Sequence, residues 1–337
     1  MKTKKLLPDD INIAADIIKN GGLVAIPTET VYGLAANALD GKAVSKIFKA
    51  KGRPMDNPLI VHVSCVEEIY NLVSHFPPQA KELADKFWPG PLTIILKRSD
   101  IIPKEVSAGL NTVAVRIPNN IVTRELIKVA GLPLAAPSAN VSGSPSPTNV
   151  NHVLNDLNGK IDAALDGGSC EVGLESTVIT LASQVPTLLR PGGVTVEELR
   201  SVLGNVKVDK AVTDKIDFSE TVSSPGMKYK HYSPKTKVII VDGNSEKFVK
   251  FVNSHADSKV AALCYIDDEP RLNVKTITFG KKDNYNMQAN ELFGALRKID
   301  NLNVNIVYAI CPQKIVVVLD VYNRLIRAAG FEVIKLE

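Results

Sequence analysis

Two cations, Lys51 and Arg53, stand on either side of a single glycine in the segment Lys51–Pro58. Lysine and arginine are the side chains with which proteins hold phosphates and carboxylates, lysine as a point charge and arginine as a two-pronged donor. Taken alone, the pair is equally well explained as two solvated surface residues. Its meaning depends on which other polar side chains the fold brings beside it.

Arg116 is harder to explain as surface charge. It interrupts the apolar stretch Val113–Ile117, which predicts a buried strand. A buried guanidinium requires an anion, supplied by the protein or by a ligand. His62 lies in a similar stretch, Leu59–Val63, where a core histidine with satisfied hydrogen bonds is the simpler interpretation.

Four further segments rich in polar residues or glycine follow predicted strands. Open α/β sheets place their ligand sites at such strand ends. The segments are Pro27–Leu34, Ala136–Thr148, Gly173–Thr177 and Leu189–Gly193. On composition alone the second would be an ordinary loop. Together with the cations, the four segments favour a pocket that neutralises phosphates and carboxylates.

Several familiar catalytic motifs do not occur in the sequence. It has no G-x-x-x-x-G-K-[ST] phosphate loop, no G-x-G-x-x-G after a strand and no G-x-S-x-G elbow. The four cysteines are widely separated and form no C-x-x-C pair, which argues against a zinc site or a disulfide framework. The residues therefore favour an enzyme that acts on anionic ligands without a protein nucleophile. They do not by themselves identify the reaction.

The elements that position these segments alternate along the first two-thirds of the chain. Helices are predicted over 11–20 and about 41–50. Capping-box spacing before two more helices is found at Ser64 with Glu67 and at Thr195 with Glu198. The predicted strands are Leu23–Ile26, Leu59–Val63, Leu92–Leu96, Val113–Ile117, Leu134–Ala136, Ile161–Leu165, Val178–Leu181 and Thr187–Arg190. This pattern predicts an α/β domain with a twisted, mixed sheet.

The pattern breaks down before a second series of elements begins. Ser223–Pro234 contains turn formers, basic residues and two tyrosines, whereas a merely flexible linker would favour glycine, serine and proline. The later predicted elements are strands at 238–241, 260–264, 274–279, 306–310 and 315–319, and helices at 245–255, 286–299 and 320–329. The expected organisation is a domain over 1–205, a linker over 206–236 and a smaller α/β domain over 237–337.

Composition limits the class of protein. With 40 basic and 36 acidic residues the net charge is +4, which is too mild for a protein that coats nucleic acid. No apolar run reaches the roughly 18 residues that a membrane span needs. Pro8–Asp10 follows the basic N-terminus where a signal peptide would be apolar. A cytoplasmic protein without a membrane partner is expected.

Taken together and in order, the motifs resemble those of the L-threonylcarbamoyladenylate synthases in their long, two-domain form. The resemblance is carried by Pro27–Leu34, Lys51–Pro54, Trp88–Thr93, Ala136–Asn140, Leu189–Gly192 and the linker segment Ser224–Pro234. It implies a YrdC-like twisted mixed sheet with a central cavity and a smaller C-terminal Rossmann-like α/β domain. The family usually has a Gly-rich segment before its last helix, where this chain has Lys314–Asp320. We therefore assign no site residues to the second domain, which the resemblance leaves as a regulatory or lid-positioning module.

The resemblance also implies a reaction. A nucleotidyltransferase of this family makes L-threonylcarbamoyladenylate from L-threonine, bicarbonate and ATP, with Mg²⁺ bound through the ATP phosphates, and releases pyrophosphate. The carboxylate of N-carboxy-threonine attacks the α-phosphorus, so no protein nucleophile is needed. The product supplies the threonylcarbamoyl group for the adenosine next to the anticodon of ANN-decoding tRNAs. The transferase machinery downstream and tRNA are therefore indirect partners.

Site residues follow from the resemblance, position by position. Lys51 and Arg53 are implied as the catalytic pair that neutralises phosphate charge. The implied ATP-binding residues are Lys51, Arg53, Asn57, Thr112, Ser138, Asn140, Ser146, Arg190 and Tyr232. The implied threonine-binding residues are Thr30, His62, Arg116, Ala136 through its backbone, and Ser176. No protein ligand to a metal is implied. Tyr232 would close over the nucleotide, which makes the linker a lid.

Two other functions fit parts of the pattern. An RNA-binding module could hold phosphates in the same pocket without chemistry, although the mild net charge counts against it. A carbamoyltransferase that forms a carbamoyl adenylate from carbamoyl phosphate uses a related domain. The acylphosphatase and zinc-finger segments that accompany that domain do not occur in this sequence.

Overall fold

The computed structural model describes residues 2–212, 232–312 and 319–336. These residues form two compact units. The first contains 2–142, 146–171 and 175–212, and the second contains 143–145, 172–174, 232–312 and 319–336. Each unit is described by itself.

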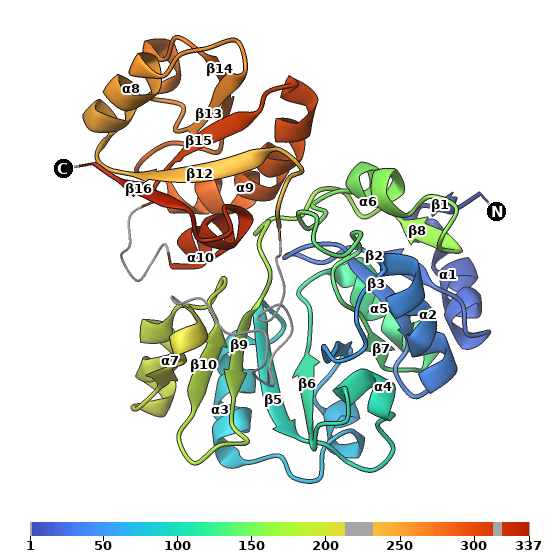
Figure 1. Cartoon of the computed structure of the whole chain (residues 1–337). Helices are drawn as coiled ribbons and strands as arrows, with labels where there is room; N and C mark the ends of the chain where they lie inside the picture. The colour runs from blue at the N-terminus through green and yellow to red at the C-terminus, as the bar shows by residue number, and fades with distance from the viewer. Residues whose placement is uncertain (1, 213–231, 313–318, 337) are drawn as a thin grey trace. The chain divides into compact units, whose positions relative to one another are not determined.

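The first unit is built on a mixed sheet (Figure 1). Among its described residues eleven strands follow the order β1-β8-β2-β3-β7-β4-β6-β5-β9-β10-β11. The strands are β1 (Lys4–Leu6), β2 (Val24–Ile26), β3 (Gly33–Asn37), β4 (Ile60–His62), β5 (Leu92–Lys97), β6 (Thr112–Arg116), β7 (Leu134–Ala135), β8 (Ala163–Leu165), β9 (Thr177–Thr180), β10 (Thr187–Arg190) and β11 (Lys207–Val208). Parallel and antiparallel pairs both occur, as in β4 with β6 and β5 with β6. The α/β fold with a mixed sheet is as expected.

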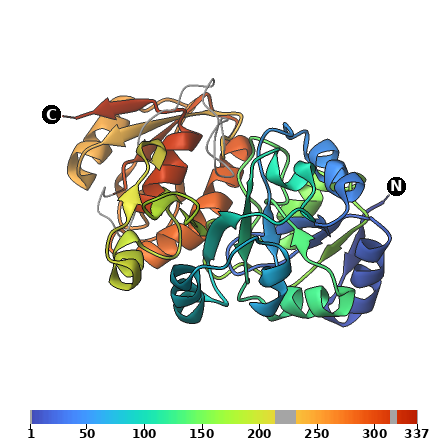
Figure 2. The ribbon, with the colours of Figure 1, turned by 90° about the horizontal axis from the view of Figure 1, so that it is seen from below.

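Helices cover both faces of this sheet (Figure 2). They are α1 (Ile11–Lys19), α2 (Gly41–Lys51), α3 (Pro78–Phe87), α4 (Lys104–Ser107), α5 (Ile121–Ala130), α6 (Val150–Leu157) and α7 (Val196–Leu203). Apolar residues of α1 and α5 share one core cluster, while α2, α3, α6 and α7 contribute to another. Neighbouring residues of β3 alternate between the clusters, since Ala35 belongs to the first and Leu34 to the second. This alternation is the two-residue period of a strand buried on both faces.

The ends of α2 determine where the two cations of the first motif stand. The Asp40 carboxylate caps the helix by accepting from the backbone N–H groups of Lys42 and Ala43. Gly52 ends it with a φ of 61°, a left-handed conformation that glycine adopts without strain. Lys51 is therefore the last helical residue, and Arg53 lies beyond the turn.

Most predicted elements of the first unit are found within one or two residues, and a few are not. The capping box of Thr195 with Glu198 is confirmed. The one expected at Ser64 is wrong, because Ser64 pairs with Glu68 and a short 3₁₀ helix, η2 (Glu67–Asn71), follows. Three short strands, β1, β3 and β11, were not predicted, and β11 extends the sheet by pairing with β10 within the expected linker range.

The second unit contains a wholly parallel sheet. Its described strands follow the order β14-β13-β15-β12-β16. They are β12 (Lys237–Asp242), β13 (Val260–Cys264), β14 (Lys275–Thr278), β15 (Ile306–Ile310) and β16 (Val333–Lys335), with helices α8 (Ser245–Ser254), α9 (Tyr285–Ile299) and α10 (Leu319–Ala328). This is the Rossmann-like arrangement expected. Of the predicted strand 315–319, residues 315–318 lie outside the described ranges, and Leu319 begins α10.

Candidate active site

Lys51 is buried at the end of α2, with 2% of its surface exposed. Its Nζ donates to the backbone oxygen of Asn140 over 2.6 Å and also to the backbone oxygen of Ser138. The Ser138 hydroxyl in turn donates to Asn140 Oδ1 over 2.6 Å. The structure therefore brings together the lysine of one motif and the serine and asparagine of another, some 90 residues later in the chain.

Arg53 and Asn57, which follow Lys51 in the chain, form a second group of polar contacts. Arg53 Nη2 donates to the backbone oxygens of Asn57 and Pro58, at 3.4 and 3.3 Å. Asn57 is buried, and its Oδ1 has no hydrogen-bond partner among the described residues. The Arg53 guanidinium is thus held against the 57–58 backbone, while the Asn57 amide oxygen is left for another donor.

Strand register gathers much of the predicted threonine site at one edge of the sheet. In the parallel pair β4·β6, His62 lies opposite Arg116 at the carboxyl ends of both strands. Thr177, which begins β9, pairs with Leu92 at the start of β5. Since β5 runs antiparallel to β6, these starts lie at the same edge. Thr112 is half-buried at the opposite end of β6, about 13 Å from Arg116 at roughly 3.3 Å per residue.

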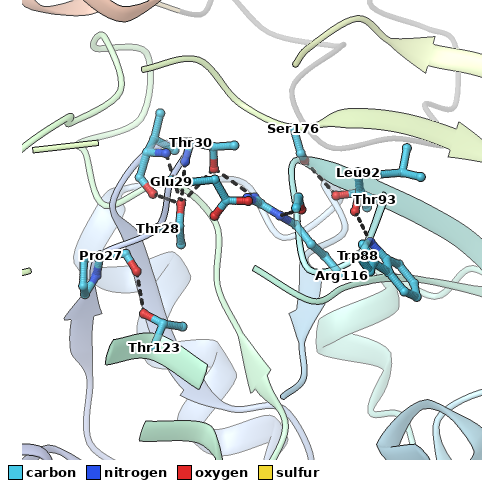
Figure 3. A network of polar contacts seen from close by, with 12 residues as sticks. Pro27, Thr28, Glu29, Thr30, Trp88, Leu92, Thr93, Arg116, Thr123 and Ser176 are labelled. Atoms are coloured by element: carbon cyan, nitrogen blue, oxygen red, sulfur yellow. Dashed lines mark hydrogen bonds and ion pairs between the residues drawn. The ribbon is translucent and has the colours of Figure 1, made fainter. Parts of the chain in front are cut away.

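Arg116 is the centre of a buried network (Figure 3). It is 3% exposed, and its Nε donates to the Gly90 backbone oxygen over 3.1 Å. Nη1 donates to Thr30 Oγ1 over 2.9 Å, and Nη2 forms an ion pair with Glu29 Oε1 over 2.6 Å. Thr28 holds the loop in shape by accepting from the backbone N–H groups of Thr30 and Val31. The anion that the sequence demanded for Arg116 is therefore present within the protein, on Glu29.

His62 is buried beside this network. Burial and then the charge of Arg116 lower its pKa to about 3, so the imidazole is neutral at pH 7. Its Nδ1 has no hydrogen-bond partner among the described residues. A core histidine with both nitrogens satisfied, the simpler interpretation of the sequence, is therefore not what the structure has.

Ser176 and Arg190 lie together, although one was predicted to contact threonine and the other ATP. Arg190 donates to the Ser176 backbone oxygen over 3.0 Å and to its hydroxyl over 3.1 Å. The Ser176 hydroxyl also lies 2.7 Å from that of Thr93. Gly192 makes the approach possible, because a Cβ at that position would collide with the backbone of Glu175–Thr177.

The remaining predicted residues are placed as follows. Ser146 is fully buried, and its hydroxyl donates to Glu175 Oε1, which ties it to the segment carrying Ser176. The Ala136 N–H donates to the Ile60 oxygen on β4 over 2.9 Å. Tyr232 belongs to the second unit, with its ring centroid 5.1 Å from that of Phe293. The predicted lid residues 213–231 lie outside the described residues.

The residues of these networks that were not singled out from the sequence include Glu29, Thr93 and Glu175. Glu29 could have been found, because a buried arginine demands an anion and Glu29 is the acidic residue of the Pro27–Leu34 motif. Thr93 and Glu175 carry no such signal, since their partners, Ser176 and Ser146, are 83 and 29 residues away in the sequence. Within the described ranges, no group of three or more His, Cys, Asp or Glu side chains is placed to hold a metal ion. No helix in those ranges is long and apolar enough to cross a membrane.

The fold and the site together define an α/β enzyme that gathers buried cations, hydroxyls and amides at one sheet, a class suited to anionic substrates. The family model described as "Telomere recombination" (Sua5, YciO and YrdC) matches residues 16–192, and the C-terminal domain model of threonylcarbamoyl-AMP synthase matches 194–330. This chain belongs to the threonylcarbamoyl-AMP synthase family. The family expected from the motifs is thus confirmed.

Individual relatives support the same assignment over the whole chain. The threonylcarbamoyl-AMP synthase of Pyrococcus abyssi is 43% identical, covering 96% of this chain and 95% of its own. That of Bacillus subtilis is 41% identical, covering 99% and 100%. The crystal structure of P. abyssi Sua5 complexed with L-threonine matches with a TM-score of 0.91 and 41% identity over the full length of both chains. Escherichia coli YciO, at 23% identity and a TM-score of 0.52, shares the fold of the first unit.

Proposed function

We propose that this chain joins L-threonine, bicarbonate and ATP into L-threonylcarbamoyladenylate and releases pyrophosphate. The observation that carries the proposal is the sheet edge where Arg116, Thr30 and His62 lie together. These are three of the residues implied for threonine, and a relative of matching length and fold binds L-threonine. Their chemistry suits an amino acid, with a guanidinium for its carboxylate and polar groups for its hydroxyl.

Lys51, Arg53, Ser138 and Asn140 are the residues that we propose for the ATP phosphates. Lys51 supplies a buried positive charge, and the Ser138–Asn140 pair supplies a hydroxyl and an amide beside it. We further assign Asn57, Thr112, Ser146 and Arg190 to the nucleotide. Such groups act by holding anions together and by stabilising the negative charge that develops at the α-phosphorus.

Magnesium is proposed to arrive with the nucleotide. The described side chains around Lys51 are amides, hydroxyls and cations, which fit phosphate oxygens better than a bare divalent ion. When bound, the ion would neutralise phosphate charge and orient the pyrophosphate leaving group. The protein's own residues then position the carboxylate of N-carboxy-threonine in line with the α-phosphorus, without a protein nucleophile.

The second domain and the linker are proposed to act around this reaction. We retain the division into 1–205, 206–236 and 237–337, with Tyr232 as a lid residue over the nucleotide. In P. abyssi Sua5 an adjacent His-Tyr pair was replaced by alanines for a structure that matches this chain with a TM-score of 0.91. The His-Tyr dipeptide occurs once in this sequence, at 231–232. We propose a cytoplasmic enzyme whose product is passed to a threonylcarbamoyl transferase acting on tRNA.

The test is pyrophosphate release from ATP, with threonine and bicarbonate supplied together and each omitted in turn. Release that requires both, with a threonylcarbamoyl-AMP mass in the product, is expected. Release with carbamoyl phosphate in place of threonine and bicarbonate would instead indicate a carbamoyltransferase. Salt-sensitive RNA binding without any pyrophosphate would indicate the RNA-binding alternative.

A further inference from the structure

We propose that Glu29 binds the ammonium group of the amino-acid substrate, so that Glu29 and Arg116 form a matched pair for a zwitterion. The inference rests on the proposed function, because it concerns the same amino-acid site. It adds a substrate-binding residue that the family resemblance did not supply.

The two oxygens of the Glu29 carboxylate have different surroundings. Oε1 forms the ion pair with Arg116 Nη2, whereas Oε2 is buried without a hydrogen-bond partner among the described residues. The whole residue is 5% exposed. Leaving a buried charged oxygen without a donor is costly, since its hydration is lost and nothing replaces it. Oε2 is therefore suited to a donor that a ligand brings.

Neighbouring hydroxyl groups do not meet this need, because their hydrogens are engaged within the loop. Thr28 Oγ1 donates to the Val31 backbone oxygen over 2.6 Å. Thr30 Oγ1 accepts from Arg116 and lies 2.8 Å from Thr28 Oγ1, to which it donates in turn. Both threonines thus stabilise the loop and Arg116, and neither donates to Glu29 Oε2.

Arg116 has N–H groups beyond those that contact the protein. A guanidinium carries five N–H groups. Three of those on Arg116 are directed at Gly90, Thr30 and Glu29. The other two can bind a substrate carboxylate, while Oε2 binds the ammonium group of the same molecule. The buried pair has no net charge, and neither has a zwitterionic amino acid, so binding places no uncompensated charge in the core.

His62 is compatible with this arrangement. It faces Arg116 in the strand register, and its low pKa keeps the imidazole neutral at pH 7. A neutral ring does not repel an ammonium group, and its Nδ1 is available for the threonine hydroxyl. A protonated histidine at this position would compete with the substrate for the Glu29 carboxylate.

The experiment compares two ligands rather than two activities. L-threonine and its 2-hydroxy analogue, in which a hydroxyl replaces the ammonium group, are titrated by calorimetry into the full-length wild type and Glu29→Gln. An ammonium contact predicts that Glu29→Gln weakens threonine by about 10- to 100-fold and does not weaken the analogue, which brings a carboxylate but no ammonium group. If Glu29 only orients Arg116, both ligands weaken by the same factor and the preference for threonine survives, which would overturn the proposal.

A matched control and a second variant test whether a change in preference is specific to the Glu29 carboxylate. Asp268→Asn removes a buried carboxylate of the second unit that also has an oxygen without a described partner, and it should leave the preference unchanged. Glu29→Asp is the second variant, for use if Glu29→Gln does not fold. It keeps a negative charge near Arg116, but its shorter side chain moves the carboxylate away from the ammonium group. It should therefore also reduce the preference for threonine over the analogue. Equal affinity of the wild type for both ligands would refute the ammonium contact outright.

Failure of the inference and failure of the proposed function are distinguishable. A wild type that releases pyrophosphate with threonine, but whose preference is unchanged in Glu29→Gln, refutes the Glu29 assignment alone. A wild type that neither binds threonine nor releases pyrophosphate with it refutes the proposed function and the Glu29 assignment together.

Discussion

Two buried cations of the first unit, Lys51 and Arg116, are held in opposite ways. The ammonium group of Lys51 donates to the backbone oxygens of Ser138 and Asn140, whereas the guanidinium of Arg116 is paired with the Glu29 carboxylate. Backbone carbonyl dipoles orient the Lys51 ammonium group, whereas a carboxylate neutralises the Arg116 guanidinium. The first arrangement fixes the position of an ammonium group, and the second suits a substrate that carries charges of both signs.

Loss of the Lys51 charge should have the largest effect. Lys51→Ala is expected to lower kcat by about 100- to 1,000-fold, equivalent to about 2.7–4 kcal/mol, because a charge facing developing phosphate charge is removed. The measurement is steady-state pyrophosphate release at saturating threonine. Lys49→Ala, an exposed cation on the same turn of α2, is the control and should stay near wild type. Near-normal turnover of Lys51→Ala would contradict the assignment of Lys51 to the ATP phosphates.

Arg116 should give a different kind of loss, divided between binding and stability. Arg116→Ala is expected to raise the KM for threonine by about 100-fold or more and the KM for ATP much less. It also leaves the buried Glu29 carboxylate without its partner, which should cost about 3–5 kcal/mol of unfolding free energy. The measurements are substrate titrations below the melting temperature and urea unfolding. An unchanged threonine KM would contradict the assignment of this arginine to the amino acid.

The sequence predicts one half of this comparison better than the other. Lys51, Ser138 and Asn140 were grouped through the family resemblance, which implied all three as ATP-binding residues, and the fold brings them together. The Arg116 network was predicted only in part, since the sequence called for an anion beside this arginine but Glu29 was not singled out. The strand β3 was missed for a related reason, because Gly33–Asn37 has no β-branched residue to mark it.

Contacts between residues far apart in the sequence were the part of the site that could not be predicted. The capping box at Thr195 involves residues three apart and was predicted correctly. The pairing of Ser176 with Thr93 joins residues 83 apart and depends on the β5·β9 register, which no local pattern encodes. Such contacts became visible once the register was known.

The effect of burying His62 beside Arg116 can be measured through stability. The unfolded chain protonates His62 below a pH of about 6.5, whereas the folded protein keeps it neutral until the pH approaches its pKa of about 3. The stability that neutral burial provides is therefore fully present above pH 6.5 and is lost as the pH falls toward 3. Between pH 7 and 5 this loss should amount to about 2 kcal/mol, at about 1.36 kcal/mol per pH unit below 6.5.

His62→Gln should remove that part of the pH dependence, because glutamine does not titrate. The difference is read from urea unfolding of both proteins at pH 7 and pH 5. His75→Gln, at an exposed histidine, is the matched control and should keep the wild-type slope. An identical slope in His62→Gln would mean that the imidazole does not stay neutral beside Arg116.

Ser138→Ala should have the smallest effect, and it tests how Lys51 is held. The substitution removes the hydroxyl that donates to Asn140 Oδ1, but it keeps the backbone oxygen that accepts from Lys51. The loss should be about one hydrogen bond, roughly 1 kcal/mol or about fivefold in kcat/KM for ATP. A loss as large as that of Lys51→Ala would mean that the Ser138 hydroxyl acts directly on the phosphates or on the ammonium group, and not only through Asn140. Backbone oxygens keep their positions whatever side chain is present. Substitutions of the residues around Lys51 should therefore be less damaging than substitutions in the Glu29–Arg116 pair.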